Sequence, residues 1–264
     1  MKETQSLIIE KLSLSYHQKK IIEQLDLAFI KGKISVIIGA NGCGKSTLLK
    51  GISRILKKDA GVVYLENTDM AQLSNRTIAT KLAYLPQSAS APEDATVRDI
   101  VELGRYPYRK MLKKISLEEN KLVDDILMQT NLLELAEEKM QNLSGGQKQR
   151  VWIGMALAQK TNIILLDEPT TYLDLGHQID ILNLLKKLNQ NNKLTIVMVL
   201  HDLNLAARFS DFMIGMKEGR IIQQGTPFEI MTPKVLEELF SIKATIGTDP
   251  VANKPICLHF DSIE

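Results

Sequence analysis

One stretch near the N-terminus constrains the fold more than any other: KISVIIGANGCGKSTLLKGI, at residues 33–52. It opens with aliphatic and β-branched residues that are typical of a buried strand. Closely spaced glycines then predict a tight turn, and a helix-like run follows. The apolar side chains predicted on one side of that helix are Leu48, Leu49, Ile52, Ile55 and Leu56. Such a unit is typical of a mostly parallel sheet that is covered by helices.

The turn matches the pattern G-x-x-x-x-G-K-[ST] over residues 39–46, in the strand-to-helix context that the pattern requires. Glycines let backbone N–H groups surround phosphate oxygens, and the helix adds the positive end of its dipole. Lys45 supplies a cation to the β- and γ-phosphates, and the Ser46 hydroxyl is a ligand for Mg²⁺. We therefore predict an ATP site that includes Gly39, Asn41, Gly42, Cys43, Gly44, Lys45, Ser46 and Thr47.

Cys43 lies inside this loop, and two interpretations of it stand. The helix end and Lys45 favour a lowered pKa of the thiol, and alkylation of that thiol would then block ATP binding. The simpler interpretation, which we prefer, is a small residue that fills space. The chain has one further cysteine, Cys257, so no disulfide framework is predicted and a reduced compartment is expected.

Composition bears on the kinds of partner that the chain can have. The 264 residues have a formal net charge of +2, which gives no reason to expect nucleic acid as a partner. The basic run RKMLKK, at residues 109–114, is interpreted as a solvated face in preference to a contact with lipid headgroups. The longest apolar runs, such as residues 194–200, are far shorter than the roughly 18 residues of a membrane span. The N-terminus lacks a signal-peptide pattern, so any membrane role is expected to need partner subunits.

Strands and helices alternate along most of the chain, which predicts an α/β fold. Strand-like runs stand at residues 6–16, 25–30, 61–66, 81–87, 162–167 and 194–201. Between residues 88 and 143 helical patterns dominate, and we interpret this segment as an insertion in the α/β core. A hairpin is predicted within residues 212–225, with its turn at Glu218 and Gly219. The tail after Ile242 has turn signals and a final strand-like run.

An apolar strand runs directly into two acids in IILLDEP, at residues 163–169. An aspartate at a strand end beside a phosphate loop suits the Mg²⁺ shell. Because side chains alternate along a strand, we expect Asp167 to face the metal and Glu168 to face the attacking water as a general base. His201 follows a strand with the character of a central one, whose end should open into the phosphate crevice. We expect His201 to reach the γ-phosphate or the water.

A second glycine-rich stretch, LSGGQKQR at residues 143–150, stands directly before an apolar, helix-like run. Ser144 and Gln147 match a capping box, which explains a helix start but does not explain two glycines. Gly145 and Gly146 make sense where backbone N–H groups must approach an anion closely. Because the chain already has a complete phosphate loop, we predict that this half-site binds the γ-phosphate held by a second copy.

LSGGQ, the phosphate loop and LLDEP together resemble the nucleotide-binding subunits of ABC transporters, over nearly the whole chain. The resemblance implies a phosphate-loop NTPase fold in one domain, with a mostly parallel core sheet, an antiparallel β subdomain and an inserted α-helical subdomain. The implied boundaries are residues 1–87 and 144–240 for the ATP-binding core, 88–143 for the helical subdomain and 241–264 for a C-terminal extension.

The same resemblance assigns roles to further residues. Tyr16 is similar to the aromatic residue that stacks on adenine, against the alternative of a strand-end tyrosine in the core. Gln87 is similar to the glutamine that touches Mg²⁺ and the attacking water. Asp174 is similar to the loop residue that crosses the dimer interface. Residues 87–108 are expected to form part of the groove that receives a helix of the membrane subunit.

Three stretches look like importer ATPases for iron–siderophore complexes, haem and vitamin B12: GRYPY, PTTYLDLGHQ and HDLNLAARFSD. This resemblance implies an ATPase at the cytoplasmic face of the cell membrane. Its implied partners are a second copy, transmembrane permease subunits and, indirectly, an extracytoplasmic siderophore-binding protein. An iron(III)–siderophore complex of the ferrichrome type is the first expectation for the substrate, followed by haem and then cobalamin.

Other classes of protein fit the sequence less well. An ABC ATPase of DNA repair has a long coiled-coil insertion, whereas residues 88–143 are short and lack heptads. A translation-factor ATPase usually has two cassettes, and this chain has one phosphate loop. A small-molecule kinase has no use for LSGGQ, and a module that only binds nucleotide has no use for Glu168 together with His201.

Overall fold

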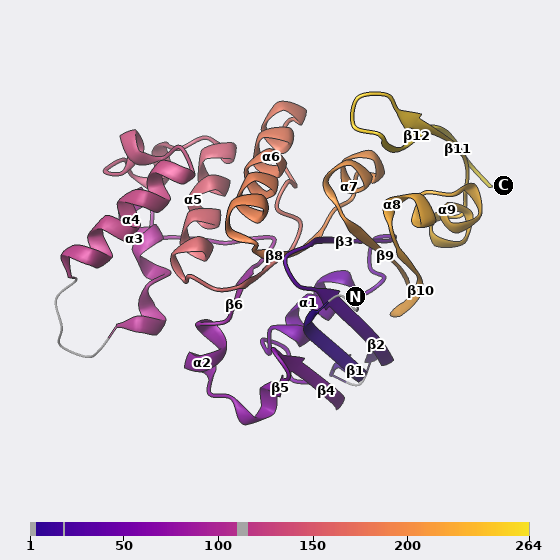
Figure 1. The fold of residues 1–264 in the computed structure, drawn as a ribbon, viewed down its shortest axis with the longest axis horizontal. Coiled ribbons are helices and arrows are strands. Elements are labelled where there is room, and N and C mark those ends of the chain that lie inside the picture. Colours follow the sequence, from indigo (N-terminus) through magenta and orange to yellow (C-terminus); the bar gives the residue numbers. More distant parts are fainter. Residues whose placement is uncertain (1–3, 18, 110–115, 264) are drawn as a thin grey trace.

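The structure is a computed structural model, which describes residues 4–17, 19–109 and 116–263 (Figure 1). Five of the six residues of the basic run RKMLKK lie outside the described residues, so its solvated face stays an expectation. Within the described residues, the helical segment α3–α4 and the C-terminal hairpin β11–β12 lie at opposite ends of the molecule (Figure 1).

The predicted strand–turn–helix unit is confirmed. β3 (Ile34–Ile38) is buried along its whole length, and α1 (Lys45–Ile52) begins as soon as the loop ends. Gly44 precedes the helix with a φ of 107°, a backbone conformation that residues with a side chain rarely adopt. This glycine therefore lets the chain turn sharply from the strand into the helix.

The helix after the loop is shorter than predicted. α1 ends at Ile52, so Ile55 and Leu56 do not continue its apolar face, and Ile55 is 62% exposed. Two residues beyond the helix, Arg54 takes a left-handed φ of 64° and donates a hydrogen bond to the carbonyl of Leu73 at 2.7 Å. The left-handed residue ends the helical path, which the periodicity of the sequence did not reveal.

The central sheet has six strands in the order β10–β9–β3–β8–β7–β6. Its other strands are β6 (Leu82–Leu85), β7 (Ile163–Leu166), β8 (Thr195–Val199), β9 (Phe212–Lys217) and β10 (Arg220–Gly225). All neighbouring pairs are parallel except β9 and β10, which form the predicted hairpin. β8 lies between β3 and β7, which confirms that the strand before His201 is central.

The two faces of this sheet bury two separate hydrophobic cores. Val36 and Ile38 of β3 belong to one core, whereas Ile37 points to the other, as the alternation of strand side chains requires. One core lies under helices α3 to α7, and the other lies under α1 and the antiparallel sheet. Burial on both faces fixes the strands, and therefore the loops that follow them.

The smaller sheet is antiparallel, in the order β2–β1–β4–β5. Its strands are β1 (Gln5–Tyr16), β2 (Lys19–Ile30), β4 (Ala60–Leu65) and β5 (Thr68–Asp69). Apolar side chains from β1 and β2, such as Leu14 and Ile22, pack against Leu48 of α1 in one core. The antiparallel sheet that the sequence predicts is therefore packed against the helix of the phosphate loop.

Helices and short 3₁₀ turns fill the predicted insertion at residues 88–143 and also stand before and after it. They are α2 (Asn75–Ala79), α3 (Val97–Leu103), α4 (Leu117–Gln129) and α5 (Gly145–Ala158), with short 3₁₀ turns η1 (Met70–Gln72), η2 (Tyr106–Tyr108), η3 (Leu133–Leu135) and η4 (Met140–Asn142). α3 begins with a capping box formed by Thr96 and Asp99, and it packs directly on α5.

The remaining helices flank the central sheet, and the chain ends in a hairpin. They are α6 (Leu175–Asn192), α7 (Leu203–Phe209), α8 (Pro227–Ile230) and α9 (Pro233–Phe240). The tail forms β11 (Ile242–Asp249) and β12 (Lys254–Ser262), so only the second of these strands was anticipated. In the part of the chain that the structure describes, no helix combines the length and apolarity of a membrane span.

Candidate active site

The residues predicted for phosphate chemistry follow the ends of neighbouring parallel strands. The phosphate loop follows β3, Gln87 follows β6, the pair Asp167 and Glu168 follows β7, and His201 follows β8. Because these four strands are parallel neighbours, their carboxyl ends lie at one edge of the sheet. The topology therefore brings together side chains that are up to 162 positions apart along the sequence, from Gly39 to His201.

Within the phosphate loop, Lys45 lies against the backbone of its own loop. Its Nζ donates hydrogen bonds to the carbonyls of Gly39 at 2.8 Å and Ala40 at 3.0 Å. The residue is only 5% exposed, so these carbonyl oxygens balance a buried cation. A phosphate oxygen that entered the loop would compete with the two carbonyls for the same ammonium.

Of the two interpretations of Cys43, the structure favours the preferred one, a small residue that fills space, and the alternative of a lowered pKa is wrong. The thiol is 7% exposed, and burial raises its pKa more strongly than Lys45, whose Nζ lies 4.0 Å from Sγ, lowers it. The Sγ atom packs against Gly39, where an added Cβ would lie only 2.9 Å away. Cys43 therefore packs as a small buried residue, and a raised pKa makes its thiol a poorer nucleophile at neutral pH.

Asp167 is joined to the phosphate loop by a direct hydrogen bond. The Ser46 hydroxyl donates to Asp167 Oδ1 at 2.8 Å, and the Tyr84 hydroxyl donates to Oδ2 at 3.3 Å. Asp167 is 3% exposed, and burial raises its pKa although both hydroxyl groups lower it. Burial and the same carboxylate raise the pKa of Tyr84.

Sequence reasoning missed Tyr84. The residue stands on β6, three positions before Gln87, and it pairs with Leu165 of the neighbouring strand β7. Tyr84 lies on β6 and Asp167 directly follows the neighbouring strand β7, and this proximity is evident only once the order of the strands is known. A polar aromatic residue inside an otherwise apolar strand was the one available signal.

Glu168 is the most constrained side chain of the site. Its Oε1 lies 2.6 Å from His201 Nε2, while its Oε2 accepts hydrogen bonds from Gln87 at 2.5 Å and Thr171 at 3.0 Å. The side chain is 10% exposed. It lines a cleft of about 270 Å³ together with His201, Thr171 and Gln178, among others. The three residues predicted for catalysis, Gln87, Glu168 and His201, are therefore brought into contact, and Thr171 was missed.

Strand alternation does not set the directions of Asp167 and Glu168, so that expectation is wrong. β7 ends at Leu166, so neither Asp167 nor Glu168 belongs to the strand. Glu168 instead takes a left-handed φ of 53°, a conformation that non-glycine residues adopt rarely and that costs free energy. This backbone turn, together with the contacts to His201 and Gln87, directs Glu168 away from Asp167.

The stretch LSGGQ forms the start of α5, with Ser144 as the N-cap. The Ser144 hydroxyl accepts from the backbone N–H of Gln147 at 3.3 Å, and the Gln147 side chain accepts from the backbone N–H of Ser144 at 2.9 Å. The predicted capping box is therefore confirmed. Its reciprocal bonds explain why Ser144 and Gln147 occur three positions apart.

Packing within the chain requires a glycine at position 146, which the sequence did not reveal. A Cβ added there would lie 2.6 Å from His177 Cδ2, closer than side chains tolerate. A Cβ added at Gly145 would lie at an ordinary 3.5 Å from Leu173 Cδ2. Packing alone therefore accounts for Gly146, and the approach of an anion stays a prediction for Gly145.

Asp174 is the N-cap of α6 and also holds His177. Its Oδ1 accepts from the backbone N–H of His177 at 2.9 Å, and its Oδ2 lies 2.7 Å from His177 Nδ1. The His177 ring in turn packs on Gly146. The loop before α6 and the start of α5 are therefore packed together within one chain.

Tyr16 lies at the end of β1, where it pairs with Lys19 across the hairpin. The residue is 39% exposed, so the alternative of a core tyrosine is wrong. Asn41 and Gly42 are also exposed, on the outer side of the phosphate loop. Thr47, by contrast, is buried at the start of α1. These positions leave Tyr16, Asn41 and Gly42 accessible to a bound molecule.

A parallel sheet with a phosphate loop, an acid bonded to its serine and a second acid held by an imidazole defines a phosphate-loop ATPase. More narrowly, the chain belongs to the ABC transporter family, whose model matches residues 22–171.

Among curated relatives, the chain is similar to the iron(3+)-hydroxamate import ATP-binding protein FhuC of Bacillus subtilis (strain 168). The two are 49% identical, over 98% of this chain and 96% of the relative.

Two solved structures extend the comparison. One contains a transporter assigned to the metal-chelate type, in an inward-facing conformation; its TM-score is 0.83 at 28% identity, over 99% of this chain and 98% of that one. The other is a dimeric structure of the ATP-binding cassette MJ0796 in a post-hydrolysis state with ADP and Pi. Its TM-score is 0.73 at 31% identity, over 83% of this chain and 98% of that one. The chain is therefore an ATPase cassette of a transporter.

Proposed function

We propose that the chain energises the uptake of an iron(III)–siderophore complex across the cell membrane. The observation that supports this substrate class is the 49% identity to an iron(3+)-hydroxamate import ATP-binding protein, which extends over 98% of the chain. The geometry that supports ATP hydrolysis is the contact of Glu168 with His201 beside the Ser46–Asp167 hydrogen bond. In this proposal the chain acts as a peripheral subunit at the cytoplasmic face of the membrane.

At the site, Lys45 and the backbone of residues 39–47 bind the phosphates of ATP, and Tyr16 stacks on adenine. The donors near the loop fit Mg²⁺, because Ser46 and Asp167 offer hard oxygen ligands whose atoms lie 2.8 Å apart. Ser46, Asp167 and Gln87 would hold the ion, which would neutralise charge on the phosphates. A bound cation would also relieve the cost of burying the Asp167 carboxylate.

Glu168 accepts a proton from the attacking water in this proposal. His201 and Gln87 fix the carboxylate from two sides, at 2.6 Å and 2.5 Å, so the base is oriented before the water arrives. His201 lines the same cleft, where it can bind either a γ-phosphate oxygen or the water. Positioning a base in this way is worth about 10²–10⁴-fold in rate.

The second half of each ATP site comes from a second copy of the chain. Ser144 and Gly145 are exposed at the start of α5, where they offer a hydroxyl and a backbone N–H to a γ-phosphate, and Gly146 lets this loop pack on His177. Asp174 lies beside it and reaches across the same interface. A similar cassette was solved as a dimer, which supports this arrangement.

The permease is expected to dock a helix on residues 87–108. These residues are Gln87 and the first part of the proposed helical subdomain at residues 88–143. Two large apolar side chains there are open to a partner: Leu103 is 50% exposed and Tyr106 is 74% exposed. An extracytoplasmic siderophore-binding protein would deliver the substrate to that permease. The proposed ATP-binding core comprises residues 1–87 and 144–240, with the C-terminal extension at 241–264.

The proposal is tested by uptake in cells whose own copy of this subunit is replaced by the wild-type chain, Glu168→Gln or Glu118→Gln. Glu118→Gln is the matched control, because it makes the same chemical change on an exposed turn of α4. We expect Glu168→Gln to abolish uptake of iron-loaded hydroxamate siderophore and Glu118→Gln to leave it intact. In the purified subunit, Glu168→Gln should lower hydrolysis about 10²–10⁴-fold while ATP still binds.

Uptake of haem and cobalamin is measured in the same cells. If haem or cobalamin uptake were lost while siderophore uptake stayed unchanged, haem or cobalamin would replace the siderophore complex as the proposed substrate. The ATPase role would stay in place. If Glu168→Gln changed none of the three, the importer proposal would be wrong.

A further inference from the structure

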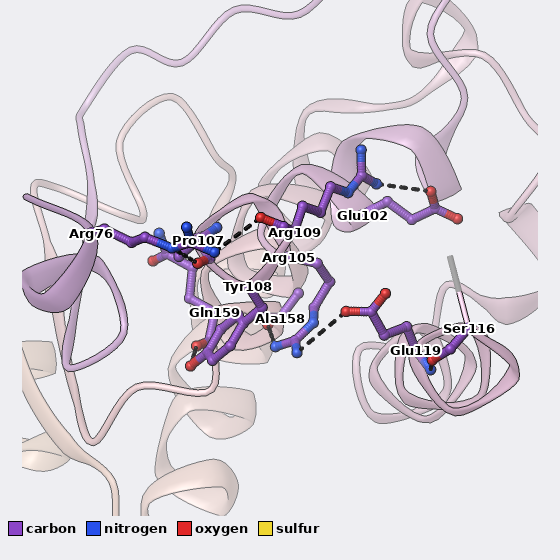
Figure 2. A network of polar contacts seen from close by, with 10 residues as sticks. All are labelled: Arg76, Glu102, Arg105, Pro107, Tyr108, Arg109, Ser116, Glu119, Ala158 and Gln159. Carbon is purple, nitrogen blue, oxygen red and sulfur yellow. Dashed lines mark hydrogen bonds and ion pairs between the residues drawn. The ribbon is translucent and has the colours of Figure 1, made fainter. Parts of the chain in front are cut away.

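The segment Gly104–Tyr108, called here the helix clamp, holds the C-terminal end of α5 (Figure 2). Arg105 Nη1 donates to the carbonyl of Ala158 at 2.7 Å, and the Tyr108 hydroxyl donates to the carbonyl of Gln159 at 2.7 Å. The last carbonyls of a helix have no partner within the helix itself. The helix clamp therefore supplies two of the missing donors.

The helix clamp is a tightly fitted arrangement. The Arg105 guanidinium stacks on the Tyr108 ring at 4.0 Å from its centroid and lies 3.9 Å from Glu119 Oε1 of α4. The side chain of Arg105 is only 11% exposed, and a cation at a helix C-terminus is favoured by the helix dipole. Gly104 completes the fit, because an added Cβ would lie 2.1 Å from the carbonyl oxygen of Met155.

Helix α5 joins the helix clamp to Ser144. Its 14 residues begin immediately after the Ser144 N-cap and end at Ala158, a span of about 21 Å. Much of the helix is buried, including Trp152 and Ile153 in the larger core, so it moves as a rigid element. A displacement of its C-terminal end therefore reaches the residues that the proposed function places against the second copy's ATP.

The opposite side of the helix clamp is exposed. Tyr106, between Arg105 and Tyr108, is 74% exposed, and Leu103 just before the clamp is 50% exposed. Arg76 of α2 also holds this segment, because its Nε and Nη2 donate to the carbonyls of Pro107 at 2.7 Å and Arg109 at 2.9 Å. Figure 2 shows Arg76 reaching the segment from α2, while Arg105 extends from the segment toward Ala158 and Glu119.

We infer that Arg105 and Tyr108 are positioning residues that transmit docking of the permease at Leu103 and Tyr106, through α5, to Ser144. This inference rests on the proposed function, which supplies the permease and the second ATP site. The buried Arg105 Nε supports it, since this atom has no hydrogen-bond partner among the described residues. A buried donor without a partner calls for a specific reason, and a fixed position of the guanidinium provides one.

The test uses the full transporter in proteoliposomes, with permease and substrate-loaded binding protein. The readout is the ratio of ATP hydrolysis with loaded binding protein to hydrolysis without it. Tyr108→Phe keeps the stacked ring and removes one hydrogen bond. Arg105→Lys keeps the positive charge and removes the planar guanidinium with its several N–H donors. Tyr64→Phe makes the same change as Tyr108→Phe on β4 of the antiparallel sheet, and it is the matched control.

We expect the ratio to fall about three- to tenfold in Tyr108→Phe and in Arg105→Lys, the shift that one lost hydrogen bond produces, and to stay unchanged in Tyr64→Phe. Binding of the permease, measured in parallel, should stay intact in both clamp variants and weaken in Tyr106→Ala. An unchanged ratio in both clamp variants, or a fall that lost permease binding explains, would overturn the inference. A wild-type transporter without any stimulation would instead refute the proposed function.

Discussion

At the scale of single residues, Asp167 shows how the site holds an unfavourable charge. Its carboxylate is 3% exposed, and burial raises its pKa above the ordinary value of 3.8 despite hydrogen bonds from Ser46 and Tyr84. A raised carboxyl pKa means that the folded chain binds its proton more tightly than the unfolded chain. Ionisation of Asp167 therefore lowers the stability of the chain when nucleotide and metal are absent.

Asp167→Asn should remove this cost, because the amide keeps an oxygen acceptor for Ser46 and carries no charge. The variant should gain stability over the wild type as pH rises from 3.8 to the raised pKa, and the gain should stay constant above that value. At more acidic pH the carboxyl is protonated in both states, so the gain vanishes. The measurement is thermal unfolding of both proteins across this pH range, without nucleotide or metal.

Asp94→Asn, at an exposed loop position, provides the control for this experiment. Asp94→Asn should show no pH-dependent gain in stability over the wild type. The account of Asp167 would be refuted by an Asp167→Asn variant that unfolds at the same temperature as the wild type at every pH.

At the scale of elements, helices α5 and α6 begin side by side and pack on each other. His177, in the first turn of α6, lies on Gly146, in the first turn of α5, and Asp174 holds the His177 ring at 2.7 Å. The N-terminal ends of both helices are therefore fixed to each other. Both of the segments proposed to reach a second copy belong to this unit.

Gly146→Ala should force the His177 ring out of place, since the new Cβ would lie 2.6 Å from it. Overpacking of this kind typically costs about 1–3 kcal/mol. Much of that cost should disappear when His177→Ala is added, because the obstructing ring is gone, so the two substitutions should be non-additive. The free energy of unfolding of the four corners of this double-mutant cycle measures the coupling.

Gly145→Ala combined with His177→Ala is the matched cycle. Its new Cβ would meet Leu173 at an ordinary 3.5 Å, so these two substitutions should be additive. Equal coupling in both cycles would show that the contact of Gly146 with His177 has no special role.

At the scale of the whole molecule, the phosphate loop and LSGGQ are built on different supports. The loop lies between β3 and α1, where the smaller antiparallel sheet packs, whereas Ser144 begins a helix that packs on α3 and α4. Each half-site therefore has its own rigid support. If one copy supplies the loop and the other supplies Ser144, defects in the two halves should complement each other between copies.

This arrangement predicts the behaviour of a mixture of Lys45→Ala and Ser144→Arg chains. Each variant alone should lack any intact site, because the first loses ATP binding and the second blocks closure with a bulky cation. In a mixed dimer, the wild-type loop of one chain meets the wild-type Ser144 of the other, which restores one site of two. ATP hydrolysis by the mixture, compared with each variant alone, measures the rescue. If both halves of the site came from the same chain, the mixture would be as inactive as its components.

Sequence alone determined the local chemistry of this protein. The phosphate loop, the acids after a buried strand and the capping box are encoded by neighbouring residues, because each depends on the geometry of one turn or one helix end. The strands and the parallel sheet followed from periodicity, since burial of both faces leaves long apolar runs. The stop of α1 at Ile52 was missed, because a single left-handed residue ended it.

Tertiary structure alone decided which distant residues meet. The hydrogen bond from Tyr84 to Asp167 depends on strand order, and the contact of His177 with Gly146 depends on how two helix ends pack. The orientation of Glu168 came from a left-handed backbone and two distant partners, Gln87 and His201, whereas strand alternation had been expected to set it. The raised pKa of Cys43 is caused by burial of the thiol. Burial depends on which atoms surround the thiol in space, so the residues next to Cys43 along the chain do not reveal it.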